Sequence, residues 1–212
     1  MKMRTIVTCA LLLCLLAGCS AGRKDNQAKL TRPVPRPPAY PERRMVAPKA
    51  ELINRAISQI QESSRSNSGY IRAHAIEAAK YLPPELMTEI VLANVEHPAS
   101  IVRFACFLTA GEMRIGQIRP YAIRSARNSS DKNVQAAAIF ALHRMGDTRF
   151  SRTLEQLAVD ADRRVRANTA MLLGLLGEPS ATRVLNRQMR DVDPVVRLQA
   201  AEAMWRLRDE SA

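Results

Sequence analysis

The chain has 212 residues, of which 25% are charged, 47% hydrophobic and only 4% aromatic, with a formal net charge of +12. This apolar fraction excludes a wholly disordered chain, and no apolar run reaches the ~18 residues of a membrane-spanning helix. Three of the four cysteines fall in the first nineteen residues, which excludes a disulfide scaffold. Residues 50–212 hold 22 basic and 18 acidic side chains, so the basic excess of the folded part is too small to indicate nucleic-acid binding.

The N-terminus has the pattern of an export signal. Lys2 and Arg4 precede an apolar stretch of twelve residues, Ile6 to Ala17, which is the length of a signal-peptide core. The sequence Leu-Ala-Gly-Cys at 16–19 follows directly and resembles the lipobox of bacterial lipoproteins. The alternative is a plain secretory signal with an incidental cysteine.

The resemblance to lipoproteins implies a processed and acylated chain. The signal peptide, residues 1–18, is then removed, and the acyl groups, palmitate among them, are carried by Cys19 and anchor the chain in a membrane of the cell envelope. Position 20 is Ser rather than the Asp that marks inner-membrane retention in this family. In an organism with two membranes, we therefore expect an outer-membrane lipoprotein that faces the periplasm.

Residues 19–49 are expected to form the lipidated cysteine and a disordered tether. Six of the twelve prolines lie here, with eight basic side chains against two acidic ones. Such a composition favours an extended or disordered linker over helix or sheet. The tether is either a solvated spacer or a segment whose charge rests on anionic lipid headgroups.

One motif recurs five times after residue 50. Each copy begins with a branched apolar residue, which we call the anchor, and the successive spacings are 31, 32, 31 and 31 residues: Ile71, Val102, Val134, Val165 and Val196. Within each copy, apolar or small residues recur four, seven, eight and eleven positions after the anchor, which is one stripe of an α-helix. Asp131, Asp162 and Asp193 lie three residues before their anchors, where a carboxylate caps a helix N-terminus.

A second apolar stripe precedes each of these helices. Pro84, Pro120 and Pro179 fit the opening turns of three of these preceding helices, and Gly146 and Gly177 fit the ends of two anchor helices. Each unit is therefore a helix, a turn and a helix, and neighbouring units must share a core because no unit can bury its stripe alone. The sequence predicts an all-α fold, a right-handed α-solenoid of about five helix pairs over residues 50–212.

This pattern resembles HEAT-like repeats, in the short form also found in phycobilin lyases. Residues 160–166 and 191–197, each with an Asp-X-Asp run before the anchor, carry the resemblance best. In that family, aspartates and an arginine form a ladder between neighbouring repeats. The resemblance implies a structural ladder made of seven side chains: Asp131, Asp162, Asp193, Arg72, Arg103, Arg166 and Arg197. Gln135 replaces the arginine in the third copy, and Ser68 and Ala99 replace the aspartate in the first two.

Catalytic patterns are absent from the sequence, and we expect no enzyme, cofactor or metal site. The His-Glu pairs by which deoxyhypusine hydroxylase, a protein of similar architecture, holds iron do not occur here, and His74, His97 and His143 are scattered. Phycobilin lyases are cytosolic, which the export signal contradicts. Cys106 falls in the small, buried column of the repeat and is expected to be a packing residue.

The candidate binding surface is a strip on the second helix of each pair. Positions two, six and nine after the anchor point away from the predicted core, and six of them are large and apolar. We expect this partner-binding strip to consist of Phe104, Leu108, Phe140, Met171, Leu198 and Trp205. The alternative is that these side chains fill gaps between adjacent second helices.

The sequence favours a membrane-anchored, non-catalytic scaffold or adaptor whose partner is an unknown protein or peptide on the curved face. Nucleic acid and small-molecule substrates are not expected. Two alternatives stay open: a repeat protein that binds a polyanion or nucleic acid, and an accessory subunit of an enzyme such as a lyase.

Overall fold

The computed structural model describes residues 49–209, and this part of the chain is helical, without strands. The predicted signal peptide and nearly all of the tether lie outside the described residues. The described helices are α1 (Ala50–Ser63), α2 (Gly69–Ala78), α3 (Pro84–Asn94), α4 (Ser100–Met113), α5 (Arg119–Asn128), α6 (Lys132–Arg144), α7 (Ser151–Leu157), α8 (Arg163–Leu176), α9 (Thr182–Gln188) and α10 (Pro194–Asp209). Short 3-10 turns lie at Ala79–Tyr81, Gly116–Ile118 and Pro179–Ala181.

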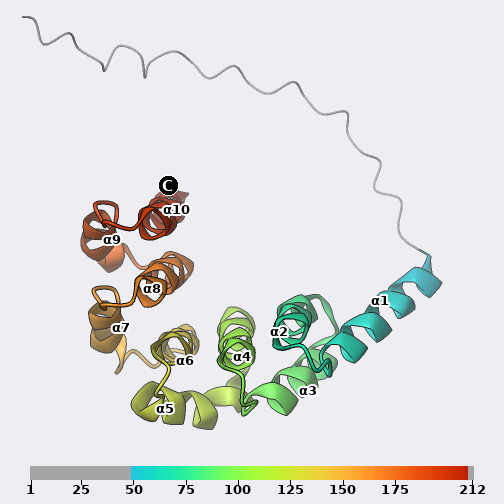
Figure 1. The fold of residues 1–212 in the computed structure, drawn as a ribbon. Coiled ribbons are helices and arrows are strands. Elements are labelled where there is room, and N and C mark those ends of the chain that lie inside the picture. The colour runs from blue at the N-terminus through green and yellow to red at the C-terminus, as the bar shows by residue number, and fades with distance from the viewer. Residues whose placement is uncertain (1–48, 210–212) are drawn as a thin grey trace, which may run out of the picture. The chain divides into compact units, whose positions relative to one another are not determined.

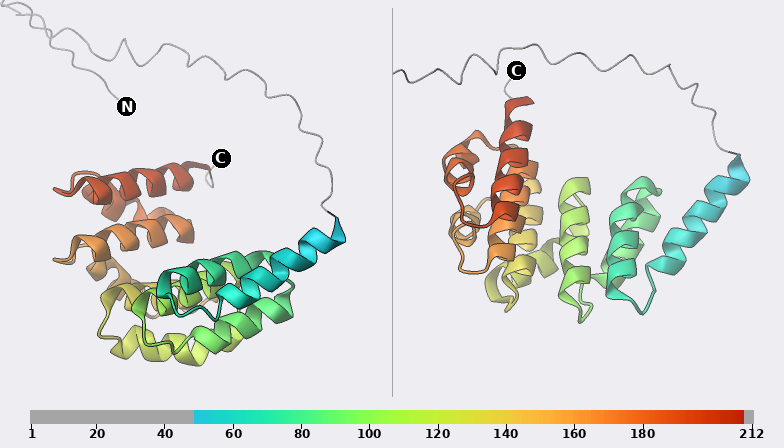
Figure 2. Two further views of the ribbon diagram at one scale, coloured as in Figure 1. Left: turned by 45° about the vertical axis from the view of Figure 1, so that its right-hand side comes forward. Right: turned by 45° about the horizontal axis from the view of Figure 1, so that its top comes forward.

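The helices form two rows. The even-numbered helices, which carry the anchors, stand side by side in the inner row, and α3, α5, α7 and α9 follow them in the outer row (Figures 1 and 2). The succession of helix pairs confirms the predicted all-α class and the α-solenoid. None of the helices in residues 49–209 is long and apolar enough to cross a membrane.

The predicted helix boundaries have the expected local causes. Asp131 Oδ1 accepts hydrogen bonds from the backbone N–H groups of Asn133 (2.8 Å) and Val134 (3.3 Å), and Asp162 accepts one from Arg164. Asp193 caps α10 in the same way. These carboxylates satisfy N–H groups that have no partner inside the helix.

Two glycines end inner helices as predicted. Gly146 and Gly177 have φ values of +85° and +72°, in the left-handed region that a residue without Cβ adopts readily. The chain can therefore turn sharply after α6 and α8 and start the next outer helix.

The core lies between the two rows. Four anchors, from Val102 to Val196, are at most 2% exposed, and the small residues four positions later include Cys106 and Thr169, both fully buried. The first anchor, Ile71, is 52% exposed. Burial in a solenoid comes from the adjacent repeat, so the residues of an end repeat follow a different pattern from those in the middle.

Neighbouring inner helices approach closely at two glycines. A Cβ on Gly111 of α4 would lie 2.5 Å from Phe140 Cε1 of α6, and a Cβ on Gly174 of α8 would lie 2.6 Å from Ala203 Cα of α10. Both glycines lie nine residues after their anchors. The inner row is therefore tightly packed where the repeat has a glycine at this position.

Candidate functional site

The predicted strip is not a continuous exposed surface. Phe140 is 0% exposed, so its prediction as an exposed binding residue is wrong. Its ring packs against Gly111 of the preceding inner helix, in the gap-filling role that was the alternative interpretation. Phe140 lies in the interior because the glycine leaves space for an aromatic ring between α4 and α6.

The other strip residues fall into two groups. Phe104, Leu108 and Met171 are half-buried and pack against the core. Leu198 and Trp205 are 66% and 61% exposed. Both exposed residues lie on α10, so the strip reduces to one face of the last helix.

Comparison with the earlier repeats explains why this face is exposed. At the position of Leu198, two residues after the anchor, the earlier repeats have Ala73 (3% exposed), half-buried Phe104, Ala136 (0%) and Ala167 (7%). At the position of Ala201, five after the anchor, Ile76, Phe107, Ile139 and Ala170 are at most 1% exposed, whereas Ala201 is exposed. At the position of Trp205, Gly111 and Gly174 meet the next inner helix. These three positions therefore face the following repeat.

We name Leu198, Ala201 and Trp205, together with the adjacent Val195 (52% exposed), the C-terminal end face. In the described residues, α10 is the last helix, and this face is where the second helix of a further repeat would pack. Its margin carries an ion pair between Arg206 and Glu202 on successive turns, with 2.9 Å between Arg206 Nη2 and Glu202 Oε1. The face is apolar at its centre and charged at one edge, an arrangement typical of protein interfaces.

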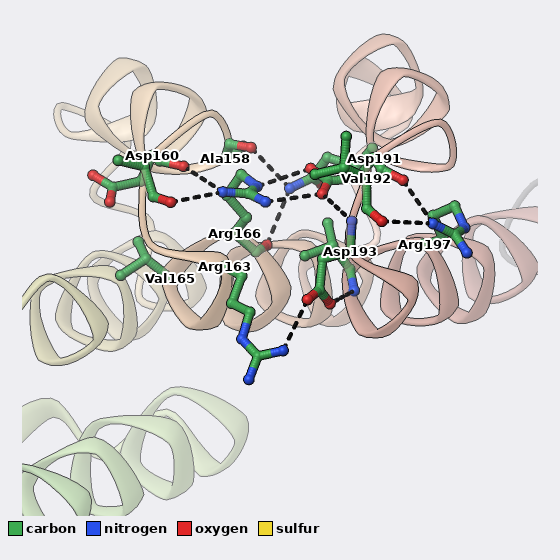
Figure 3. Close-up of polar contacts among 12 residues, drawn as sticks. Ala158, Asp160, Arg163, Val165, Arg166, Asp191, Val192, Asp193 and Arg197 are labelled. Carbon is green, nitrogen blue, oxygen red and sulfur yellow. Dashed lines mark hydrogen bonds and ion pairs between the residues drawn. The ribbon is translucent and has the colours of Figure 1, made fainter.

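Of the predicted Arg/Asp ladder, the arginine column forms one ion pair between repeats, and its acidic partner differs from the one expected. Arg166 forms a bidentate ion pair with Asp191 of the next repeat, with Nε–Oδ2 2.8 Å and Nη2–Oδ1 2.9 Å (Figure 3). Its Nη1 also donates to the carbonyl oxygens of Asp160 and Ala161 in the preceding loop. The pKa of Asp191 is lowered, chiefly by the hydrogen bonds from Arg166.

The remaining arginines of the column share the loop contact. Arg72, Arg103 and Arg197 each donate to carbonyl oxygens five to seven residues earlier in the chain. Arg72 also reaches the next repeat, where Asn94 accepts at 3.1 Å. In the third repeat, Gln135 replaces the arginine and donates to the carbonyl of Ala126. The column therefore closes the turn inside each helix pair.

The capping aspartates play a smaller part between repeats. Among the three, Asp193 also pairs with Arg163 of the preceding repeat, at 3.0 Å from Nη1 to Oδ2. The hydrogen bond from Arg163 is the main cause of its lowered pKa. Asp160 pairs with Lys132 of the preceding repeat in a similar way.

Sequence reasoning missed the column five residues before the anchor. Ser66, His97, Asp160 and Asp191 there each accept a hydrogen bond from the backbone N–H two residues later. The residue type varies, but each of these side chains has a hydrogen-bond acceptor atom close enough to the main chain to accept from that N–H group. Burial, with the charges of Arg72 and Arg103, lowers the pKa of His97.

The described residues contain no group of three or more His, Cys, Asp or Glu side chains that could hold a metal ion. Cys106 is fully buried between the rows, and burial raises the pKa of its thiol. A protonated, enclosed thiol is a poor nucleophile, so its position is that of a packing residue.

One groove of the described structure has a basic wall. A cavity of about 610 Å³ lies beside α9 and the turn after α7, and exposed Arg183, Arg187 and Arg190 line it. Arg166 and Asp191 also border it, but they neutralise each other. Asp160 also lines the groove and pairs with Lys132 outside it, so the groove presents three arginines without an acidic partner.

Comparison with known proteins supports the repeat assignment. Residues 120–205 match a family model described as HEAT repeats. No curated protein matches the chain. A crystal structure of an engineered protein also matches, with a TM-score of 0.44 and 14% sequence identity over 72% of this chain and 79% of that one. Residues 120–205 are thus similar to HEAT repeats, and the rest of the described chain continues the same succession of helix pairs.

Proposed function

We propose that the chain is a non-catalytic interaction scaffold, held in the bacterial cell envelope by a lipid on Cys19, and that a protein partner docks on its C-terminal end face. The HEAT-like repeats support the scaffold. The Leu-Ala-Gly-Cys sequence at 16–19 after an apolar stretch supports the anchor, and Ser20 favours the outer membrane of a two-membrane cell.

The observation that carries the proposed docking site is the exposure of Leu198. This side chain is 66% exposed at a repeat position where three earlier residues are at most 7% exposed. No described helix covers this side of α10, so its apolar side chains face water. A partner that covers the C-terminal end face removes this surface from water, which is favourable at about 25 cal/mol per Å² of apolar area.

A photo-crosslinking residue at position 198 of the full chain tests the docking site in intact cells. We expect one or a few discrete adducts, and we expect them to disappear when Val195→Glu is added on the same face. The matched control is the same crosslinker at Arg152, an exposed residue of α7. Equal adducts from both positions, or none from position 198, contradict the docking site.

The anchor needs its own test. Cys19→Ser removes the sulfur that carries the first lipid, so we expect the protein to lose metabolic palmitate labelling and to leave the membrane fraction. Cys106→Ser is the matched control, since that thiol is buried in the repeat domain. A Cys19→Ser protein that remains in the membrane fraction contradicts the lipid anchor.

The basic groove favours a second candidate function, the binding of a polyanion. Within the described residues, Arg183, Arg187 and Arg190 have no acidic partner within ion-pair distance, and all three line one groove, two from α9 and one from the turn after it. Polyanion binding weakens steeply with salt because neutralised phosphates release counterions. Binding of a heparin or nucleic-acid probe that is abolished by Arg187→Glu supports this function, and salt-independent or absent binding excludes it.

A further inference from the structure

We infer that an open cavity between the C-terminal ends of α4 and α6 binds a phosphate monoester group, which Arg114, Arg119 and Arg144 hold. The cavity has a volume of about 620 Å³, a size typical of small-molecule sites. It shares no residue with the C-terminal end face or with the basic groove beside α9, so the inference does not depend on the proposed function.

Three segments of the chain bring positive charge to this cavity. Arg114 follows α4, Arg119 begins α5, and His143 and Arg144 end α6. The charged side chains that line the cavity are all basic. His143 Nε2 lies 3.9 Å from Glu178, which is not among the lining residues, so the net charge comes from the arginines. The two helix C-termini contribute about half a negative charge each, which three guanidinium groups exceed.

The repeat itself does not require these charges. The next junction, between α6 and α8, has uncharged residues at the same four positions counted from the anchors: Gly146, Phe150, Gly174 and Leu175. The inner helices pack side by side there without any of the four basic side chains. The cluster is therefore a property of the junction between α4 and α6 and not of the fold.

Arg114 stands at a position that favours glycine. Its φ is 54°, in the left-handed region, and within residues 49–209 it is the non-glycine residue with a positive φ. The equivalent residues after α6 and α8 are Gly146 and Gly177. This conformation is unfavourable for a residue with a Cβ. Nevertheless, the exposed Arg114 side chain has no hydrogen-bond or ion-pair partner among the described residues, so no contact in the fold offsets the strain.

Arg144 carries a charge that is only partly solvated. The side chain is half-buried, and its Nε is buried and donates to no acceptor among the described residues. A guanidinium group has five N–H donors, and a buried donor without an acceptor is unfavourable. An anion in the cavity would offset the charge of this guanidinium, which is favourable because water reaches it incompletely.

The acidic side chain beside Arg119 does not cancel the charge of the cavity. Asp147 Oδ2 lies 3.8 Å from Arg119 Nη1, but Asp147 accepts two hydrogen bonds from Arg149, at 2.8 and 2.7 Å. Arg149 therefore neutralises Asp147. Arg119 Nη2 donates to the carbonyl oxygen of Met145 at 2.9 Å, which holds its guanidinium group beside the end of α6.

A phosphate monoester matches these donors better than a carboxylate or a phosphodiester does. The monoester carries about 1.5–2 negative charges at pH 7 and has three acceptor oxygens. A carboxylate has one charge and two oxygens, which a single guanidinium group satisfies. A phosphodiester also has one charge. Three guanidinium groups from three segments therefore favour the monoester, which either a free phosphorylated molecule or a lipid headgroup supplies.

Protection from arginine modification tests the site in the full chain, purified in a non-ionic detergent. Phenylglyoxal modifies accessible guanidinium groups, and mass spectrometry locates each modified arginine. We expect methyl phosphate to slow the modification of Arg114 severalfold, whereas dimethyl phosphate and acetate at the same concentration should have little effect. Arg152, an exposed residue of α7, is the internal control and should react at the same rate in every sample.

Arg114→Gly separates binding from folding. Glycine relieves the backbone strain, so we expect the variant to unfold at the same temperature as the parent or at a higher one. Its affinity for methyl phosphate, measured by calorimetry, should nevertheless fall about tenfold or more, because a charge-assisted hydrogen bond is lost. Arg144→Gln should weaken binding to a similar extent, and the matched control Arg152→Gln should leave the affinity unchanged.

Short-chain phosphatidic acid, which carries the same monoester on a lipid, distinguishes the two sources. Binding more than tenfold tighter than that of methyl phosphate, and weakened by Arg114→Gly, supports a lipid headgroup; equal affinities support a free phosphorylated molecule. The inference is overturned if methyl phosphate does not protect Arg114, or if Arg114→Gly binds it as tightly as the parent does. Equal binding of dimethyl phosphate excludes the monoester, and loss of binding in Arg187→Gln alone places the anion in the basic groove instead.

Discussion

Gly174→Ala is expected to destabilise the repeat domain, although alanine favours helix more than glycine does. The added Cβ would lie 2.6 Å from both Cα and Cβ of Ala203, whereas ordinary contact begins near 3.4 Å. The inner helices α8 and α10 would have to separate by roughly 1 Å, and overpacking of this kind costs about 1–3 kcal/mol. Alanine returns about 1 kcal/mol through helix propensity. We expect a net loss of about 1–2 kcal/mol in the free energy of unfolding.

Urea unfolding followed by circular dichroism measures this loss, and amide hydrogen exchange shows whether α10 opens first. Gly116→Ala is the control, because nothing lies within 4 Å of a Cβ placed there. Adding Ala203→Gly should not rescue Gly174→Ala, because the Ala203 Cα remains in the way. A Gly174→Ala protein as stable as the parent, or more stable, would refute the close approach of α8 and α10.

Three further changes have defined outcomes. Phe140→Asp places a carboxylate at a fully buried position, so we expect the free energy of unfolding to fall by about 3–5 kcal/mol or more and the cooperative unfolding transition to be lost. The same change at an exposed strip residue should leave the melting curve intact. Arg166→Lys cannot keep the bidentate bond to Asp191 and should cost about 1–2 kcal/mol in urea unfolding; Arg163→Lys, at a more exposed pair, should cost less than 1 kcal/mol. The hydrogen bond from Arg149 lowers the pKa of Asp147 from 3.8 to about 2, so this carboxylate stabilises the fold above about pH 4 and loses its contribution as the pH falls towards 2. Asp147→Asn should flatten that part of the pH–stability curve by about 1 kcal/mol, since Arg149 is largely exposed; an unchanged curve would contradict the pairing.

The architecture could be predicted from the sequence because the repeats can be aligned with one another within the single chain. A stripe that recurs every 31 or 32 residues marks the inner helices, and Asp131, Asp162 and Asp193 mark where three of them begin. These signals are local: a cap and a stripe act within one helix. The structure confirms them because local rules decide where helices start and which side of each helix packs against the outer row.

The burial of Phe140 could not be predicted from these signals. Whether a side chain on the inner row is covered depends on the distance to the neighbouring helix, and that distance depends on a residue about thirty positions away. Gly111 brings α4 close to α6 and makes space for the ring. In a single sequence, the burial of Phe140 could be predicted only by comparing residue sizes on neighbouring inner helices. A small residue at a position that faces a large residue in the next repeat indicates that the large side chain fills the space between the two helices.

The ladder shows a second limit of the sequence analysis: repeat positions considered one at a time do not show which residues pair with each other. Arg166 fits its column, but its acidic partner is Asp191, five residues before the next anchor, rather than the capping Asp193. Both aspartates lie in one short loop, and the resemblance to known repeats does not distinguish them. Geometry assigns the capping role to one and the ion pair to the other.

A residue's position in a repeat has a fixed meaning only where a neighbour follows. Leu198 would be a packing residue in any earlier repeat, because the next inner helix would cover it. It is exposed in α10 because, among the described residues, no further helix follows. An apolar residue at this position is one that a further helix or a partner would bury, and we therefore propose that a partner docks on this face of α10 rather than on the curved face of the inner row.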